Sequence, residues 1–148
     1  DIVVTEADTK YMGYQGQSVE SICVGTPLPD YERLFEVSLE CFNLILDAMK
    51  PGVPYADLVR IWENHAERSG VLPKGAIGHG LGLGQDRPRA IQGTDAGGFV
   101  VDDGHVFILK PVVCSLDRHR QNRAGNAVVV ENGSARRLGR LKMEMRRI

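Results

Sequence analysis

The sequence predicts an α+β fold, in which strands and helices form separate blocks along the chain. Three observations support this class: a β-like run over residues 2–24, two helical patterns between residues 30 and 69, and further β-like runs from residue 106 to 138. A doubly wound sheet would instead alternate strands and helices. We expect one domain over residues 1–148, with 140–148 as a candidate tail.

Composition narrows the class of protein and its partners. The formal net charge is −1 and charged residues make up 25%, so neither nucleic acid nor an anionic membrane is expected as a partner. No apolar run reaches the roughly 18 residues of a membrane span, and no signal peptide is visible. Cys23, Cys41 and Cys114 lie in apolar runs without metal-type spacing. They predict buried thiols in a reducing compartment, and therefore a cytoplasmic protein.

The first β-like run predicts a long hairpin. Residues 2–6 and 11–24 are rich in β-branched and aromatic residues, and Asp8-Thr9-Lys10 forms polar punctuation between the two arms. Gly25-Thr26-Pro27 ends the second arm. Because the chain begins without methionine inside a β-like run, we expect residues before Asp1 to belong to the same native protein.

Two helices follow the hairpin. Asp30 is the expected N-cap of the first, whose apolar residues recur at spacings of three and four until Pro51-Gly52 stops the helix. The second helix is predicted from Tyr55 to Ser69, with Gly70 as its C-terminal cap. Trp62 falls in the apolar stripe of this helix, so we interpret it as a core residue.

The segment Ile77-Gly78-His79-Gly80-Leu81-Gly82-Leu83 has the composition of a functional loop. Its alternating glycines allow a close approach of the backbone to a ligand, and the His79 imidazole is able to act as ligand, acid or base. The alternative is a surface loop with an idle histidine.

The run over residues 106–113 predicts a buried central strand, because it is apolar on both faces. Lys110 interrupts it, and a buried lysine is costly unless it is paired or functional. Residues 117–120 are expected to form a solvated turn. Asn132-Gly133 predicts a hairpin between residues 127–131 and 134–138, and the tail is expected to be helical or frayed.

The order of these landmarks resembles the pita-bread fold of the M24 peptidase family, which includes methionine aminopeptidase, Xaa-Pro dipeptidase and creatinase. The resemblance rests on five landmarks: Gly13-Tyr14; Val24-Gly25-Thr26-Pro27; Met49-Lys50-Pro51-Gly52-Val53; Ile77 to Leu83 with Pro88; and Val128-Val129-Val130 with Asn132-Gly133. It implies a curved antiparallel sheet covered by helices, without the N-terminal part of the domain. It also implies a homodimer, or association with the missing N-terminal segment.

The metal ligands of the family are largely replaced in this chain. The resemblance implies two metal ions held by two aspartates, one histidine and two glutamates, and these positions fall on Glu6, Gln17, His79, Lys110 and Gly125. Two dications need several anionic oxygens, which this set lacks. We therefore expect no metal cofactor, and we expect the Lys110 ammonium to pair with Glu6 or with a substrate carboxylate.

A second departure lies just before Pro88, where the peptidases have a histidine and a glutamate and this chain has Asp86 and Arg87. We predict His79 as the general acid/base, with Glu6 or Asp86 orienting the imidazole or activating water. Lys110 completes this catalytic set. Four further residues are expected to bind the substrate or stabilise developing negative charge: Gln17, Gly80, Arg87 and Arg123.

The resulting hypothesis is a metal-independent, creatinase-like hydrolase or lyase for a small amide, dipeptide or other C–N substrate. One alternative is a catalytically inactive pita-bread domain that binds a peptide or protein. Another is a metal-dependent Xaa-Pro peptidase with unconventional ligands. An enzyme predicts that His79, Lys110 and at least one of Glu6 or Asp86 converge within about 4 to 6 Å on a closed pocket, whereas a silent domain predicts that this pocket is filled or open.

Overall fold

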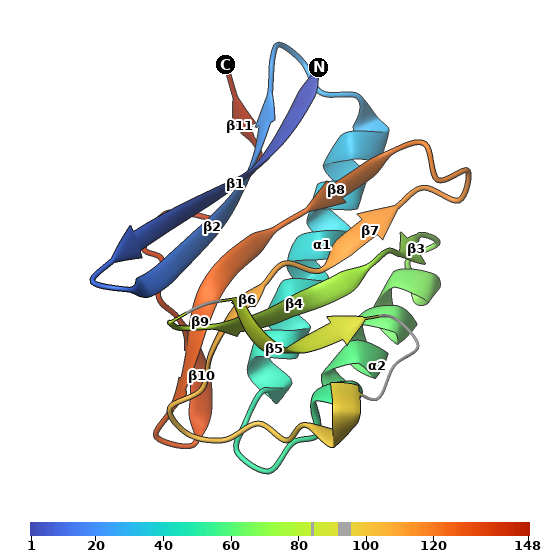
Figure 1. Ribbon diagram of the computed structural model, residues 1–148. Coiled ribbons are helices and arrows are strands. Elements are labelled where there is room, and N and C mark those ends of the chain that lie inside the picture. The colour runs from blue at the N-terminus through green and yellow to red at the C-terminus, as the bar shows by residue number, and fades with distance from the viewer. Residues whose placement is uncertain (84, 92–95) are drawn as a thin grey trace.

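The computed structural model describes residues 1–83, 85–91 and 96–148, without the side chains of residues 85, 86, 90 and 91. Its main sheet has the order β1-β2-β9-β6-β4-β5, with β10 beside β9 and β11 beside β2 (Figure 1). The strands of this sheet are β1 (Ile2–Tyr11), β2 (Tyr14–Cys23), β4 (Ala76–Leu81), β5 (Gln85–Ile91), β6 (Val106–Leu109), β9 (Gly125–Glu131), β10 (Ser134–Arg137) and β11 (Arg146–Arg147). A smaller sheet contains β3 (Leu72–Pro73), β7 (Val112–Cys114) and β8 (Gln121–Arg123).

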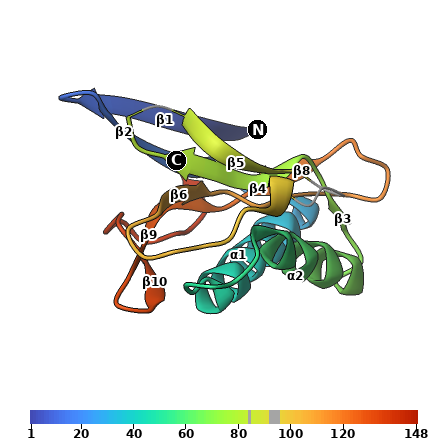
Figure 2. The same ribbon diagram turned by 60° about the horizontal axis from the view of Figure 1, so that its bottom comes forward.

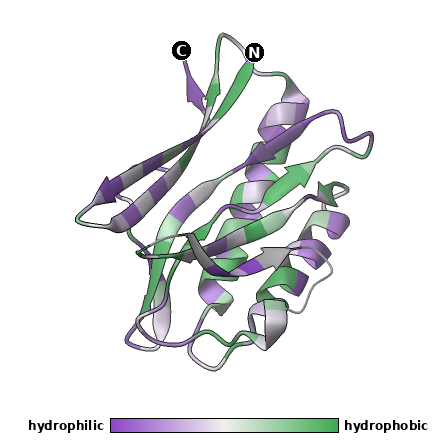
Figure 3. Ribbon diagram, in the orientation of Figure 1, coloured by the Kyte–Doolittle hydropathy of each residue, from purple (hydrophilic) through white to green (hydrophobic). Residues whose placement is uncertain are grey.

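Both long helices, α1 (Pro29–Ala48) and α2 (Tyr55–Arg68), cover one face of the sheet (Figure 2). Their apolar stripes meet residues of β6, β7 and β9 to form the core, in which Trp62 and Phe42 are fully buried. The hairpin β1–β2 projects beyond the helices and is largely hydrophilic toward its turn, whereas β7 is hydrophobic (Figure 3). The predicted α+β class and the burial of all three cysteines are confirmed.

The first hairpin is present, but the prediction that its arms are separated by residues 8–10 is wrong. Tyr11 pairs with Tyr14, so Met12 and Gly13 form the turn. Both have positive φ, 49° and 90°, as a two-residue type I′ turn requires. Asp8-Thr9-Lys10 belong to β1 because both faces of the projecting hairpin meet solvent there, so polar side chains carry no desolvation cost.

The helices match the sequence predictions except at one end. Helix α1 begins at Pro29, with Leu28 as its N-cap and no capping side chain, so the predicted N-cap at Asp30 is wrong. Proline is suited to the first helical position because its missing N–H has no partner there. Helix α2 ends before Ser69, and Gly70 follows with φ of 73°, as the sequence predicts.

The glycine-histidine segment is a strand, β4, and the prediction of a loop is wrong. Strand β4 pairs with β5 on one side and β6 on the other. Gly78 is necessary here because a Cβ at this position would lie 1.9 Å from the carbonyl oxygen of Ile108. Gly78 therefore permits the close packing of β4 against β6.

The apolar run over residues 106–113 does not form one strand as predicted. Strand β6 lies in the main sheet and β7 in the smaller sheet, and Lys110 and Pro111 form the junction between them. Proline lacks the N–H that a continuous strand would use, which explains the break. The hairpin β9–β10 is confirmed. In the tail, Arg146 and Arg147 pair with β2 rather than being helical or frayed.

Candidate functional site

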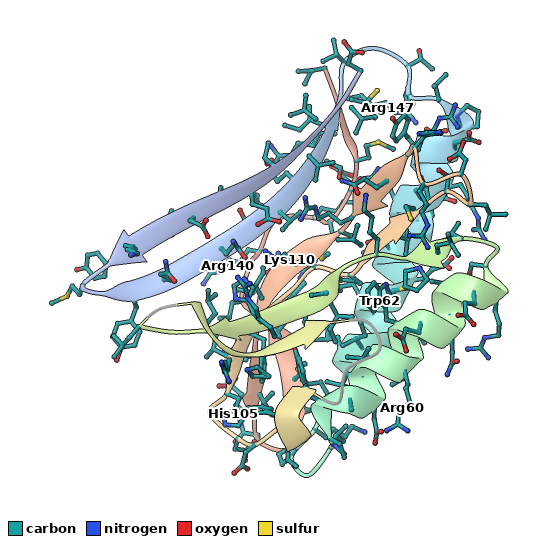
Figure 4. The ribbon with its side chains drawn as sticks, turned by 45° about the vertical axis from the view of Figure 1, so that its right-hand side comes forward. Arg60, Trp62, His105, Lys110, Arg140 and Arg147 are labelled. Atoms are coloured by element: carbon teal, nitrogen blue, oxygen red, sulfur yellow. The ribbon has the colours of Figure 1, made fainter. Side chains whose placement is uncertain are left out.

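A cavity of about 410 Å³ lies where the hairpin β1–β2 faces strands β4 and β5. Four charged or titratable side chains line it: Glu6 from β1, His79 from β4, Arg89 from β5 and Lys110 from the β6–β7 junction. Figure 4 shows Lys110 between the hairpin and β4. The small residues Gly75, Ala76 and Gly78 complete the lining and leave the volume open.

Glu6 is the anionic centre of this site and is held by two cations. The Lys110 ammonium donates a hydrogen bond to Glu6 Oε2 at 2.8 Å, and the Arg123 guanidinium donates to Oε1. Burial raises the pKa of Glu6, but the Lys110 hydrogen bond and the charges of Lys110 and Arg123 outweigh it and hold this pKa below its ordinary value. Glu6 is therefore a carboxylate at neutral pH.

Gln17 connects this ion cluster to Asp8. Its side-chain oxygen accepts a hydrogen bond from Lys110 Nζ at 3.2 Å, and its Nε2 donates to Asp8 Oδ1 at 2.8 Å and to Glu6 Oε2 at 3.4 Å. Gln17 is 5% exposed. A neutral amide suits this place because it donates to the carboxylates and accepts from the ammonium.

His79 is 5% exposed, and its ring is fixed by its neighbour. Nδ1 lies 2.9 Å from the carbonyl oxygen of Gly80, so this nitrogen carries the proton and Nε2 has the free lone pair. Burial lowers the pKa of His79, and the charges of Lys110 and Arg89 lower it further, against the opposing effects of the Gly80 carbonyl and Glu6. The imidazole is therefore neutral at pH 7 and is able to accept a proton.

The structure brings together most of the residues singled out from the sequence. Glu6, His79 and Lys110 line one cavity, and Gln17 and Arg123 contact its carboxylate. Their roles in catalysis stay predictions.

Three residues of the predicted site stand apart from this group. Arg87 and Gly80 line a neighbouring cavity of about 390 Å³, together with Tyr14 and Phe107, and are not among the residues that line the His79 cavity. The backbone of Asp86 pairs with that of Gly80, but its side chain lies outside the described residues.

Arg89 lines the cavity and was not among the predicted site residues. It stands opposite His79 in the β4–β5 register and forms no ion pair with the residues that the structure describes. Its signal in the sequence is weak, because residues 85–91 lack the alternating apolar pattern that identifies a half-buried strand.

The donor set does not fit the two-metal centre of the family. Lys110 puts an ammonium beside the Glu6 carboxylate, and Gln17 is neutral. Gly125 has no side chain, and a Cβ there would lie 2.8 Å from Lys110 Cβ. Within the described part of the chain, no group of three His, Cys, Asp or Glu side chains is placed to hold a metal ion. Two dications require several anionic oxygens at short range.

Comparison with known proteins identifies the family. The model of metallopeptidase family M24 matches residues 1–133. The chain belongs to this family. Methionine aminopeptidase A of Synechocystis sp. is 31% identical over 116 residues, which cover 76% of this chain and 46% of the relative. The Xaa-Pro dipeptidase of Lactobacillus helveticus is 25% identical over 114 residues, covering 75% of this chain and 30% of the relative.

Solved structures of M24 peptidases share the fold. An X-Pro aminopeptidase from Thermotoga maritima superposes with a TM-score of 0.89 at 20% identity, covering 100% of this chain and 41% of that chain. Prolidase from Pyrococcus furiosus gives a TM-score of 0.85 at 25% identity, covering 96% and 42%. The pita-bread fold expected from the resemblance is confirmed.

These relatives also limit what the match establishes. The chain spans less than half the length of the curated relatives it matches, 46% and 30% in the two cases above. The kinship to M24 hydrolases is therefore shown, while the activity of the whole protein is a matter of proposal. Among the described residues, no helix has both the length and the apolar character that a membrane crossing needs. The cytoplasmic location and the homodimer stay predictions.

Proposed function

We propose that this M24 domain is a metal-independent, creatinase-like hydrolase or lyase that acts on a small amide, dipeptide or other C–N substrate. One observation supports this proposal above the others. The neutral His79 imidazole, fixed through Nδ1 by the Gly80 carbonyl, shares a cavity of about 410 Å³ with Lys110 and Arg89. A base beside two cations is an arrangement that can activate water and stabilise the negative charge that develops during C–N bond hydrolysis.

In the proposed hydrolysis, His79 Nε2 takes a proton from a water molecule as its oxygen attacks the electrophilic carbon of the substrate. The electron pair of the C=O bond moves to oxygen, where the Lys110 ammonium stabilises the negative charge. Collapse of this intermediate breaks the C–N bond, and the imidazolium returns the proton to the leaving nitrogen. The products are a carboxylic acid and an amine, and no oxidant or metal takes part.

The charges around the cavity favour an anionic substrate. Lys110 and Arg123 are both bonded to Glu6, whereas Arg89 has no ion pair among the described residues. A substrate carboxylate is therefore expected to meet the Arg89 guanidinium, which is able to bind both oxygens. Glu6 stays ionised, so it is suited to accept a hydrogen bond from the nucleophilic water or the substrate amine rather than to act as an acid.

One observation favours the alternative of a catalytically inactive binding domain. Both Lys110 and Arg123 find their partner in Glu6, so the ion cluster is satisfied without any ligand. Such a cluster is also what stabilisation of the hairpin alone would produce. A metal-dependent Xaa-Pro peptidase receives less support, because the donor set does not fit two metal ions.

A substrate panel distinguishes these functions. Small amides, dipeptides and guanidino compounds are incubated with the protein, with and without a chelator. We expect turnover that survives the chelator and is lost in His79→Gln. His65→Gln is the matched control, because His65 lies on α2 and pairs with Glu40 at 2.8 Å, outside the cavity. Turnover retained in His79→Gln contradicts the assigned base, and about two bound metal equivalents by elemental analysis contradict the metal-independent mechanism.

A further inference from the structure

The two cations that hold Glu6 lie at matching breaks in neighbouring strands. Leu109 pairs with Asn126 at the end of the main sheet, and Val112 pairs with Arg123 at the start of the smaller sheet. Between these pairs lie Lys110 and Pro111 on one strand and Ala124 and Gly125 on the other. The pairing of the two strands is therefore interrupted over these residues; Lys110 lies within the interruption and Arg123 at its edge.

A buried serine of α1 bridges this interruption. Ser38 is fully buried, and its Oγ donates a hydrogen bond to the Pro111 carbonyl oxygen at 2.6 Å. The same oxygen accepts a hydrogen bond from the Ala124 N–H at 2.7 Å. These two contacts fall on the residues that directly follow Lys110 and Arg123. One hydroxyl thus joins the two strands where their own pairing is interrupted.

We propose that Ser38 is a positioning residue, whose hydroxyl fixes the two strand junctions so that Lys110 and Arg123 both reach the Glu6 carboxylate. Serine is suited to this place because its hydroxyl donates and accepts at once. On the other side, the Lys110 N–H donates to the Ile77 carbonyl oxygen at 2.7 Å, so this junction is fixed from both neighbours. The proposal assigns Ser38 no contact with a substrate.

Removal of the hydroxyl has a specific expected consequence. In Ser38→Ala, the Pro111 carbonyl and the Ala124 N–H lose their buried partner, so the junction is expected to shift to satisfy them. The Lys110 ammonium then spends less time beside Glu6 and His79. A role in catalysis rests on the proposed function, but the positioning of Lys110 is measurable without any substrate.

The test is an NMR titration of His79 in the whole chain, with the resonances assigned through His79→Gln. The charged neighbours that act on His79 are Lys110, Arg89 and Glu6. In Ser38→Ala, the pKa of His79 is expected to rise toward its ordinary value, because the repulsion by Lys110 weakens. In the Lys110→Met background, Ser38→Ala is expected to leave this pKa unchanged.

The matched control is Ser115→Ala in the β7–β8 turn. Ser115 Oγ accepts a hydrogen bond from the Arg120 N–H at 3.1 Å, which reproduces the backbone contact of Ser38 away from the cavity. This variant is expected to leave the pKa of His79 unchanged. The proposal is overturned if Ser38→Ala does not move this pKa, or if the shift persists in the Lys110→Met background.

A conservative variant covers the case in which Ser38→Ala does not fold. Ser38→Cys keeps a group that donates and accepts, but its larger sulfur lengthens and weakens both hydrogen bonds. It is expected to raise the pKa of His79 in the presence of Lys110 and not in its absence. The same pKa in Ser38→Cys and the unmodified chain overturns the proposal. Lack of turnover in the substrate panel leaves these results unaffected and bears on the proposed function alone.

Discussion

Replacement of Lys110 by methionine tests whether the ion cluster stabilises the hairpin against the sheet. Lys110 Nζ lies 2.8 Å from Glu6 Oε2, and the two side chains are 14% and 29% exposed. At an effective dielectric constant of about 20, their attraction is about 6 kcal/mol before desolvation is subtracted. Charge-assisted hydrogen bonds contribute about 1.5–3 kcal/mol net. Because Arg123 remains bonded to Glu6, we expect Lys110→Met to lower the free energy of unfolding by about 2 kcal/mol at pH 7.

The pH dependence identifies Glu6 as the origin of this loss. The pKa of Glu6 lies below its ordinary value of 4.5 in the folded protein. The pair therefore stabilises the fold fully above pH 4.5, and its contribution disappears as the pH falls through the lower folded pKa. The difference in unfolding free energy between the original chain and Lys110→Met is therefore expected to shrink as the pH falls below 4.5 and through the folded pKa of Glu6.

Urea unfolding followed by circular dichroism at pH 7 and at acid pH measures both quantities. Lys142→Met is the matched control, since Lys142 pairs with Glu144 at 2.6 Å but is 79% exposed. It is expected to leave the unfolding free energy unchanged. An equal loss for Lys110→Met at both pH values, or no loss at pH 7, would refute the reasoning.

Three further outcomes are expected. The pKa of His79 is lowered from 6.5. For a substrate found in the panel, kcat/KM should therefore decrease at acid pH with a midpoint below pH 6.5. A midpoint above pH 6.5 contradicts the assignment of neutral His79 as the base. Gly78→Ala should cost roughly 3 kcal/mol or more in urea unfolding, because its Cβ would lie 1.9 Å from the Ile108 carbonyl oxygen. Gly125→Ala should cost about 1–3 kcal/mol, because its Cβ would lie 2.9 Å from the Leu109 carbonyl oxygen. Gly16→Ala is the control for both glycines, since its Cβ meets the movable Thr9 hydroxyl at 3.2 Å; a larger loss there shows that any alanine in the sheet is harmful.

The helices were predictable because their stability depends on a periodic pattern. Apolar residues at spacings of three and four define the buried faces of α1 and α2, and Trp62 falls where that pattern puts it. Strands β4 and β5 lack such a pattern. In β4 the glycines mimic a loop, although Gly78 serves the close approach of β6, which the sequence of β4 alone does not contain. Whether β4 and β5 form strands therefore depends on their pairing with each other and with β6, which is distant in the sequence.

The same distinction applies to the site. Lys110 was recognisable because a lysine within an apolar run is costly, and its expected partner Glu6 is its partner in the structure. Arg89 was not recognisable, because its place in the cavity depends on the register that sets it opposite His79. Gly80 is next to His79 in β4, where successive residues face opposite sides of the sheet. Arg87 is two residues from Arg89, so simple alternation would put both on one face; the pairing of β4 with β5 shifts register between His79–Arg89 and Gly80–Asp86, and Arg87 lines the other cavity.

Lys110 and Gly125 constrain each other sterically. A Cβ at position 125 would lie 2.8 Å from Lys110 Cβ, 2.9 Å from the Leu109 carbonyl oxygen and 3.0 Å from Val19 Cγ2. The segment that carries Lys110 therefore fills the room that a side chain at 125 needs, and the Lys110 ammonium pairs with Glu6. A carboxylate side chain at 125 alone would clash with Lys110 Cβ and the Leu109 carbonyl oxygen, and one at 110 alone would repel Glu6. Neither single replacement provides a cation site. In this chain, the positive charges of Lys110 and Arg123 neutralise the Glu6 carboxylate instead.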